Sequence, residues 1–236
     1  MSKNRKVFIG INLFIFVTMV IAVASTLIFG GRATRIDNGT SVGATELADG
    51  TFGGVKIQYW HHIASFTILS NIFLGVIALI TAIIAIKNPK KPFSSKISTW
   101  YLIAATSTML TFLVVLFFLA PMRAMNGKNY FDMFLEQMFF LHFLNPILGA
   151  ISFVFFFNTK EIIGLKPRLL SILPPVIYST PYMLCVCIIK CWPDFYGLTF
   201  GGKYYLIPFD YLVVCGIMFG VSSALATLHN RFSVAE

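Results

Sequence analysis

The stretch that decides the fold is residues 63–86, which read IASFTILSNIFLGVIALITAIIAI. It holds no charged residue, and it is longer than the roughly 20 apolar residues with which an α-helix crosses a bilayer. Most of its polar residues gather near its start, where Thr67, Ser70 and Asn71 stand at positions i, i+3 and i+4. On a helix this spacing places the three side chains on one face.

Five more apolar runs of similar length accompany it, at residues 7–29, 100–120, 138–157, 169–189 and 207–228. Hydrophobic residues make up 57% of the chain and charged residues 11%, against about 25% charged in soluble domains. Because the runs are continuous and do not alternate, they exclude a β-barrel. The sequence predicts an all-α, polytopic membrane protein: one six-helix transmembrane domain over residues 1–236, with no internal repeat of the kind many transporters carry.

Basic residues set the expected orientation of these helices. Counting Lys and Arg in the segments between runs gives eleven on the side of the N-terminus and seven on the other. Since the richer side is normally cytoplasmic, we expect both termini and the 87–96 loop in the cytoplasm, and a long outer loop from Gly30 to His62. The net charge of +9 therefore reflects membrane topology and predicts no nucleic-acid partner.

The sequence points to no metal and no cofactor. The four cysteines at 185, 187, 191 and 215 lack the spacing of a zinc site. His61 and His62 have no acidic or Cys partner at ligand spacing, so a solvated pair is expected there. The first run is too long for the apolar core of a signal peptide, which predicts that it is retained.

Thr67 and His142 are the candidate catalytic residues. Each stands four residues inside its run, counted from Ile63 and from Met138, so both lie roughly 6 Å below the expected outer boundary. A hydroxyl and an imidazole are the minimum for nucleophilic acyl transfer, in which His takes the proton and the oxygen attacks an ester carbonyl. The competing interpretation is that Thr67 and Ser70 bond only to helix carbonyls.

Pro146 adds to this constellation because it has no N–H, which predicts that the carbonyl of His142 loses its helical partner. A polar pocket beside His142 would satisfy that carbonyl, although an ordinary proline kink is the simpler explanation. Asn145, at i+3 from His142, and Asn71 are candidate oxyanion stabilisers, and Ser70 is assigned to hydrogen bonding in the pocket.

The start of the sixth run supplies two supporting candidates, Tyr205 and Asp210. A carboxylate at the edge of an apolar run is costly and usually has a partner, so Asp210 is a candidate for orienting His142. It is equally compatible with a hydrated boundary residue or a helix N-cap after Pro208.

At these residues the chain resembles the six-span androgen-induced and androgen-dependent membrane hydrolases, and more closely their bacterial relatives. The shared marks are the aromatic-Thr-x-x-Ser-Asn start at Phe66–Asn71, the His-x-x-x-Pro at His142–Pro146, and the Tyr…Pro-Phe-acidic element from Tyr204 to Asp210. The resemblance implies hydrolysis of fatty acid esters of hydroxy fatty acids, with Thr67 as nucleophile, His142 as its partner and a bacterial plasma membrane as the location.

The sequence thus predicts an intramembrane hydrolase, or acyl transferase, of a lipid or fatty acid ester, working near the outer leaflet without a cofactor. Its expected partners are that ester and the membrane lipids. A channel, transporter or lipid-binding protein is the alternative. The absence of a charge deep in any run weakens the channel, and the absence of a mid-span acid weakens the coupled transporter.

Overall fold

The computed structural model describes residues 2–36, 40–41, 44–45, 51–52, 55–56, 63–125, 127–192, 194, 196–199 and 202–233, with side chains omitted for 29–62. Within these residues six helical segments are long and apolar enough to cross a membrane, which confirms the predicted number. They are Lys3–Ile28, Phe66–Lys87, Ser95–Met125, Glu136–Phe156, Leu165–Ile189 and Tyr204–Phe232.

The helical segments are built from shorter elements. They run α1 (Lys3–Ile36), α3 (Phe66–Lys87), α4 (Ser95–Val114), η1 (Val115–Leu119), α5 (Ala120–Met125), η2 (Tyr130–Phe134), α6 (Glu136–Phe139), η3 (Phe140–Leu144), α7 (Asn145–Ile151), η4 (Ser152–Phe156), α8 (Leu165–Leu170), α9 (Leu173–Met183), η5 (Leu184–Ile189), η6 (Tyr204–Leu206) and α10 (Ile207–Ser233). Two short antiparallel strand pairs join β1 (Thr40–Ser41) to β2 (Ala44–Thr45) and β3 (Thr51–Phe52) to β4 (Val55–Lys56).

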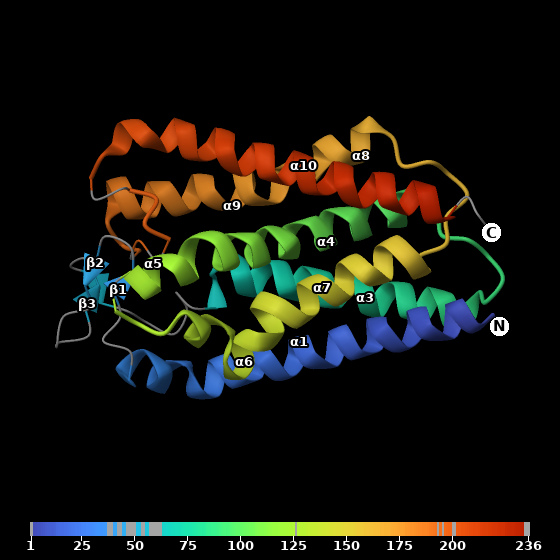
Figure 1. Cartoon of the computed structure of the whole chain (residues 1–236), viewed down its shortest axis with the longest axis horizontal. Helices are drawn as coiled ribbons and strands as arrows, with labels where there is room; N and C mark the ends of the chain where they lie inside the picture. Colours follow the sequence, from blue (N-terminus) through green and yellow to red (C-terminus); the bar gives the residue numbers. More distant parts are fainter. Residues whose placement is uncertain are drawn as a thin grey trace.

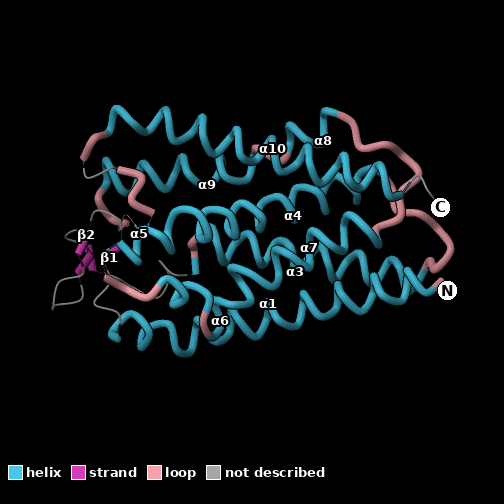
Figure 2. The backbone as a smooth tube through the Cα atoms, viewed as in Figure 1, coloured by secondary structure: helices cyan, strands magenta, loops and turns pink. Residues whose placement is uncertain are grey.

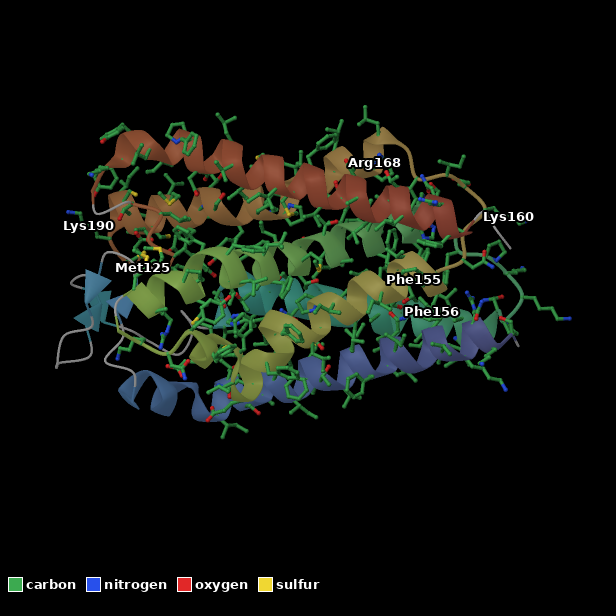
Figure 3. The ribbon with its side chains drawn as sticks, viewed as in Figure 1. Met125, Phe155, Phe156, Lys160, Arg168 and Lys190 are labelled. Atoms are coloured by element: carbon green, nitrogen blue, oxygen red, sulfur yellow. The ribbon has the colours of Figure 1, made fainter. Side chains whose placement is uncertain are left out.

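The helices form an elongated bundle with both chain termini at one end and the strands at the other (Figures 1 and 2). We call these the terminal end and the distal end. Lys160 and Lys190 mark the two ends in Figure 3.

Helix α1 is longer than the sequence predicted. Its 34 residues continue past Gly30 and Gly31 to Ile36, a length of about 51 Å. The predicted roles of His61 and His62 lie outside the described residues.

Helices α1, α3, α4 and α7 form the well-packed half of the bundle. Close approach of α7 to α3 depends on Gly149, where an added Cβ would lie 2.9 Å from Cδ2 of Leu74. At the terminal end an aromatic cluster fills the core, with Phe93 stacked on Phe157 at 4.3 Å and Tyr101 stacked on Phe153 at 5.7 Å. The segments containing α9 and α10 are the least buried of the six.

Among the described residues there are four short π-helical stretches: η1 and η3 interrupt the third and fourth of these helical segments, and η4 and η5 end the fourth and fifth. Each widens the turn by one residue, which rotates the side chains that follow relative to a regular α-helix. The sequence periodicity did not predict these stretches, and two of them, η1 and η3, lie beside the features described below.

The position of the termini generates a topology prediction. In a variant whose four natural cysteines are replaced by serine, we expect Lys91→Cys to react with a membrane-impermeant maleimide only after the membrane is opened. Lys203→Cys, at the other end of the bundle, should react in intact cells. The opposite pattern would reverse the orientation expected from the distribution of basic residues.

Candidate functional site

A cavity of about 550 Å³ lies in the distal half of the bundle. Its walls come from the start of α3, the end of α4 with η1, the middle of α9 and the first half of α10. Most of the lining is aliphatic or aromatic, and the polar groups in it are few: Thr67, Thr111, Tyr178, Ser179, Tyr196, Asp210 and Tyr211. An apolar cleft of this size with a few polar groups is the usual form of a small-molecule site.

Thr67 reaches the cavity from the first turn of α3. Ser65 caps this helix, since its Oγ accepts a hydrogen bond from the N–H of Ile68 at 3.4 Å. The Tyr196 hydroxyl accepts a hydrogen bond from the N–H of Phe66 at 2.9 Å, and the Thr67 side chain lies next to the same hydroxyl. Burial raises the pKa of Tyr196, so its phenol stays protonated and can donate a hydrogen bond.

Tyr196 is a site residue that the sequence analysis missed. It lies in a turn that Asp194 organises. The Asp194 carboxylate accepts hydrogen bonds from the N–H of Leu198 at 3.0 Å and from the N–H of Thr199 at 2.9 Å. Tyr182 of α9 donates to the same carboxylate at 3.1 Å. Asp and Gly are residues that favour turns, so Asp194 and Gly197 were the available sequence clue to an ordered turn here.

His142 lies in η3 with 5% of its surface exposed. Its Nδ1 is 2.7 Å from the carbonyl oxygen of Met133. A carbonyl can only accept a hydrogen bond, so Nδ1 carries the proton and Nε2 keeps its lone pair. The ring is therefore held in the tautomer in which Nε2 is the basic nitrogen.

The structure does not join the two candidate catalytic side chains directly. Thr67 lines the cavity, whereas His142 is not among the lining residues, and no hydrogen bond between them exists in the described part of the chain. Asn71 links their segments instead: its Nδ2 donates to the carbonyl of Thr67 at 2.9 Å and to the carbonyl of Leu141 at 3.0 Å.

Asn71 satisfies the backbone carbonyl that Pro146 leaves without a donor. In η3 the N–H of Asn145 bonds the carbonyl of Phe140, five residues earlier. The next residue, Pro146, would donate to Leu141 in this register but has no N–H. In an α-helical register the unpaired carbonyl would be that of His142, as predicted from the sequence; the π-turn makes it the carbonyl of Leu141.

The other candidate from the fourth run, Asn145, is fully buried and bonded to two helices. Its Oδ1 accepts from Thr18 Oγ1 of α1 at 2.7 Å, and its Nδ2 donates to Asn71 Oδ1 at 3.4 Å. Neither Asn71 nor Asn145 lines the large cavity. In this arrangement both side-chain amides join helices to one another.

The remaining candidates, Ser70, Asp210 and Tyr205, differ in their position relative to the cavity. Ser70 is buried, 3.3 Å from Thr111 Oγ1, so it supports a cavity-lining hydroxyl. Asp210 is half-buried in the cavity wall, and no hydrogen bond joins it to His142 in the described residues. Tyr205 is 75% exposed and does not line the cavity.

No protein-family model, curated protein or solved structure matches the chain. The resemblance to the androgen-induced and androgen-dependent hydrolases therefore stays a prediction. Among the described residues, no group of three or more His, Cys, Asp or Glu side chains is placed to hold a metal ion.

The Asn71 contacts give a stability prediction. Asn71→Leu keeps a similar volume but leaves the Leu141 carbonyl and the Nδ2 group of Asn145 without their partner. Because an unpaired buried polar group costs about 1–3 kcal/mol, we expect the free energy of unfolding to fall by about 2 kcal/mol or more. Reversible unfolding in mixed detergent measures it.

Thr81→Val is the matched control on the same helix. Among the described residues, the Thr81 hydroxyl bonds only carbonyls of its own helix, those of Ile77 and Ala78, so its loss should cost less than about 0.5 kcal/mol. Equal losses for the two variants would show that the Asn71 amide has no special part in joining the helices.

Proposed function

We propose that this protein is an integral membrane protein that binds an acyl lipid in the distal cavity, with the ester or acid group of the lipid at Thr67 and Tyr196. The observation that carries the proposal is the cavity of about 550 Å³, whose wall is largely apolar but contains these two hydroxyls. An acyl chain would replace water against the apolar wall, and the hydroxyls would pair with the lipid's oxygens.

The membrane itself is part of the proposal. The excess of basic residues at the terminal end favours placing that end in the cytoplasm and the cavity toward the outer leaflet. The polar head of a lipid lies near the interface, close to the depth of Thr67 in the first turn of α3. A bacterial plasma membrane is the location that the family resemblance implies.

The second candidate function is hydrolysis of the bound ester. It is favoured by the orientation of His142, whose Nδ1 is fixed by Met133 so that Nε2 is the base. In this reaction Nε2 takes the Thr67 proton, Oγ1 bonds to the acyl carbon, and the alcohol leaves with that proton; water then releases the acid and restores Thr67. The His142 ring or its segment must move to reach Thr67, because the two are not hydrogen-bonded here.

Binding is tested with an acyl ester that carries a photoreactive group in its chain. Val214 lines the cavity and Leu212, two residues away on α10, is 72% exposed and does not. We expect Val214→Trp to remove most of the crosslinking because the indole occupies the acyl site, and Leu212→Trp to leave it unchanged. Crosslinking that survives Val214→Trp would place the ligand elsewhere.

Hydrolysis is tested with a fluorophosphonate probe and with ester turnover. We expect Thr67→Ala and His142→Ala to abolish both, Thr67→Ser to retain part, and Ser70→Ala to weaken them without removing them. Ser179→Ala is the matched control, since Ser179 is another cavity-lining hydroxyl that bonds only its own helix.

If the wild type is unlabelled but still crosslinks the acyl ester, the protein binds lipid without hydrolysing it. If labelling disappears in Ser70→Ala and survives in Thr67→Ala, Ser70 is the nucleophile. The two experiments thus separate the binding proposal from the catalytic one.

A further inference from the structure

A second, smaller cavity of about 70 Å³ lies at the terminal end, away from the acyl site. Its polar walls come from the start of α1, the turn after α3 and the end of the η4 segment, and they include Ser2, Asn4, Arg5, Lys90, Lys91 and Asn158. The volume holds several waters or one small oxyanion, and is too small for an acyl chain.

Arg5 is the unusual residue in this wall. Only 5% of its surface is exposed, and its guanidinium lies 4.3 Å from the ring centre of Phe93. Its Nη2 donates to the carbonyls of Asn88 and Lys91, both at 3.3 Å, while its buried Nε has no hydrogen-bond partner.

Among the described residues, no acidic side chain balances the charge of Arg5. In the part of the chain that the structure describes, Arg5 forms no ion pair with an acidic side chain, and no acidic residue lines this cavity. A buried cation is costly unless it is paired, and two carbonyls and an aromatic ring supply only part of that pairing. The exposed Lys90 and Lys91 add two more positive charges to the same wall.

An apolar surface adjoins the charged wall. Phe155 is 52% exposed and Phe232 is 46% exposed, with ring centres 4.9 Å apart, and both line the cavity. Phe155 and Phe156 lie close to the N-terminal part of α1 in Figure 3. Positive charge beside exposed aromatic rings fits an amphipathic ligand with an anionic head.

We propose that this cavity binds the phosphate of an anionic phospholipid from the leaflet at the terminal end. The phosphate would accept hydrogen bonds from the Arg5 guanidinium and Ser2 and face Lys90 and Lys91, while the lipid chains would lie against Phe155 and Phe232. Arginine is suited to phosphate because its donors form a planar fork, and basic residues next to a spanning helix attract anionic lipids.

The test compares two double variants of the full chain in zwitterionic nanodiscs. Lys90→Ser with Lys91→Ser removes two charges from the cavity wall. Lys87→Ser with Lys96→Ser removes two charges from exposed positions on either side that do not line it. Binding of phosphatidylglycerol is measured by native mass spectrometry, with phosphatidylcholine and inorganic phosphate as the other probes.

We expect the wild type and the Lys87/Lys96 variant to retain phosphatidylglycerol equally and to prefer it to phosphatidylcholine. The Lys90/Lys91 variant should bind it about tenfold more weakly, as expected for the loss of nearby charges. Because both positions are exposed, this variant should fold as the wild type does. Circular dichroism checks that expectation.

Three results would overturn the proposal. Equal weakening in both double variants would mean that only the general surface charge attracts the lipid. Equal retention of phosphatidylcholine would mean that the site does not select an anionic head. Saturation of the site by inorganic phosphate, with no added effect of lipid, would assign the cavity to a free anion.

Discussion

The hydrogen bond from the Asn71 amide to the carbonyl of Leu141 is the contact on which the distal half of the bundle depends. A proline in a helix leaves a carbonyl without a donor, and in an apolar environment that carbonyl must find another. Asn71 supplies the donor from a different helix, so the proline becomes a point of attachment between α3 and η3. Asn145 and Thr18 extend the connection to α1.

The same solution occurs at the end of the third spanning segment. There the N–H of Ala120 bonds the carbonyl of Val115 in the π register, so Pro121 is the residue that fails to donate to Leu116. The hydroxyl of Tyr130 donates to that carbonyl at 2.8 Å. At both places a π-turn precedes a proline, and a side chain from another element takes the place of its missing N–H.

The proposed chemistry at Thr67 depends on whether its hydroxyl can reach His142. The His142 ring has a neutral hydrogen-bond partner at Nδ1, the carbonyl of Met133, and the Thr67 side chain lies next to the Tyr196 hydroxyl. The proposed reaction keeps the bond at Nδ1, which contributes about 0.5–1.5 kcal/mol, and needs a conformer in which Nε2 accepts a hydrogen bond from Thr67. A conformer of this kind needs only a minor population to support turnover.

The number of helices and their approximate limits could be predicted, because uninterrupted apolar runs such as residues 63–86 have few alternatives. The polar face of α3 was also predictable, and Thr67 does line a cavity. The partners of that face were not. Asn71 and Asn145 were expected near a reacting oxyanion, but Asn71 bonds the Leu141 carbonyl and Asn145 bonds Asn71. The π-turn that leaves the Leu141 carbonyl without a donor has no mark in the hydrophobic periodicity. Tyr196 was missed because it stands in a loop, where long-range contacts and not local pattern decide its position.

The uneven burial of the helices has a consequence for access. The segments containing α9 and α10 are the least buried, and together they form one side of the distal cavity proposed to bind the acyl lipid. Helices with few buried contacts separate from their neighbours at small free-energy cost, whereas α1, α3 and α7 are tied by buried amides. A lipid would therefore enter sideways from the bilayer between the loosely held helices, and its chain would never have to pass through water.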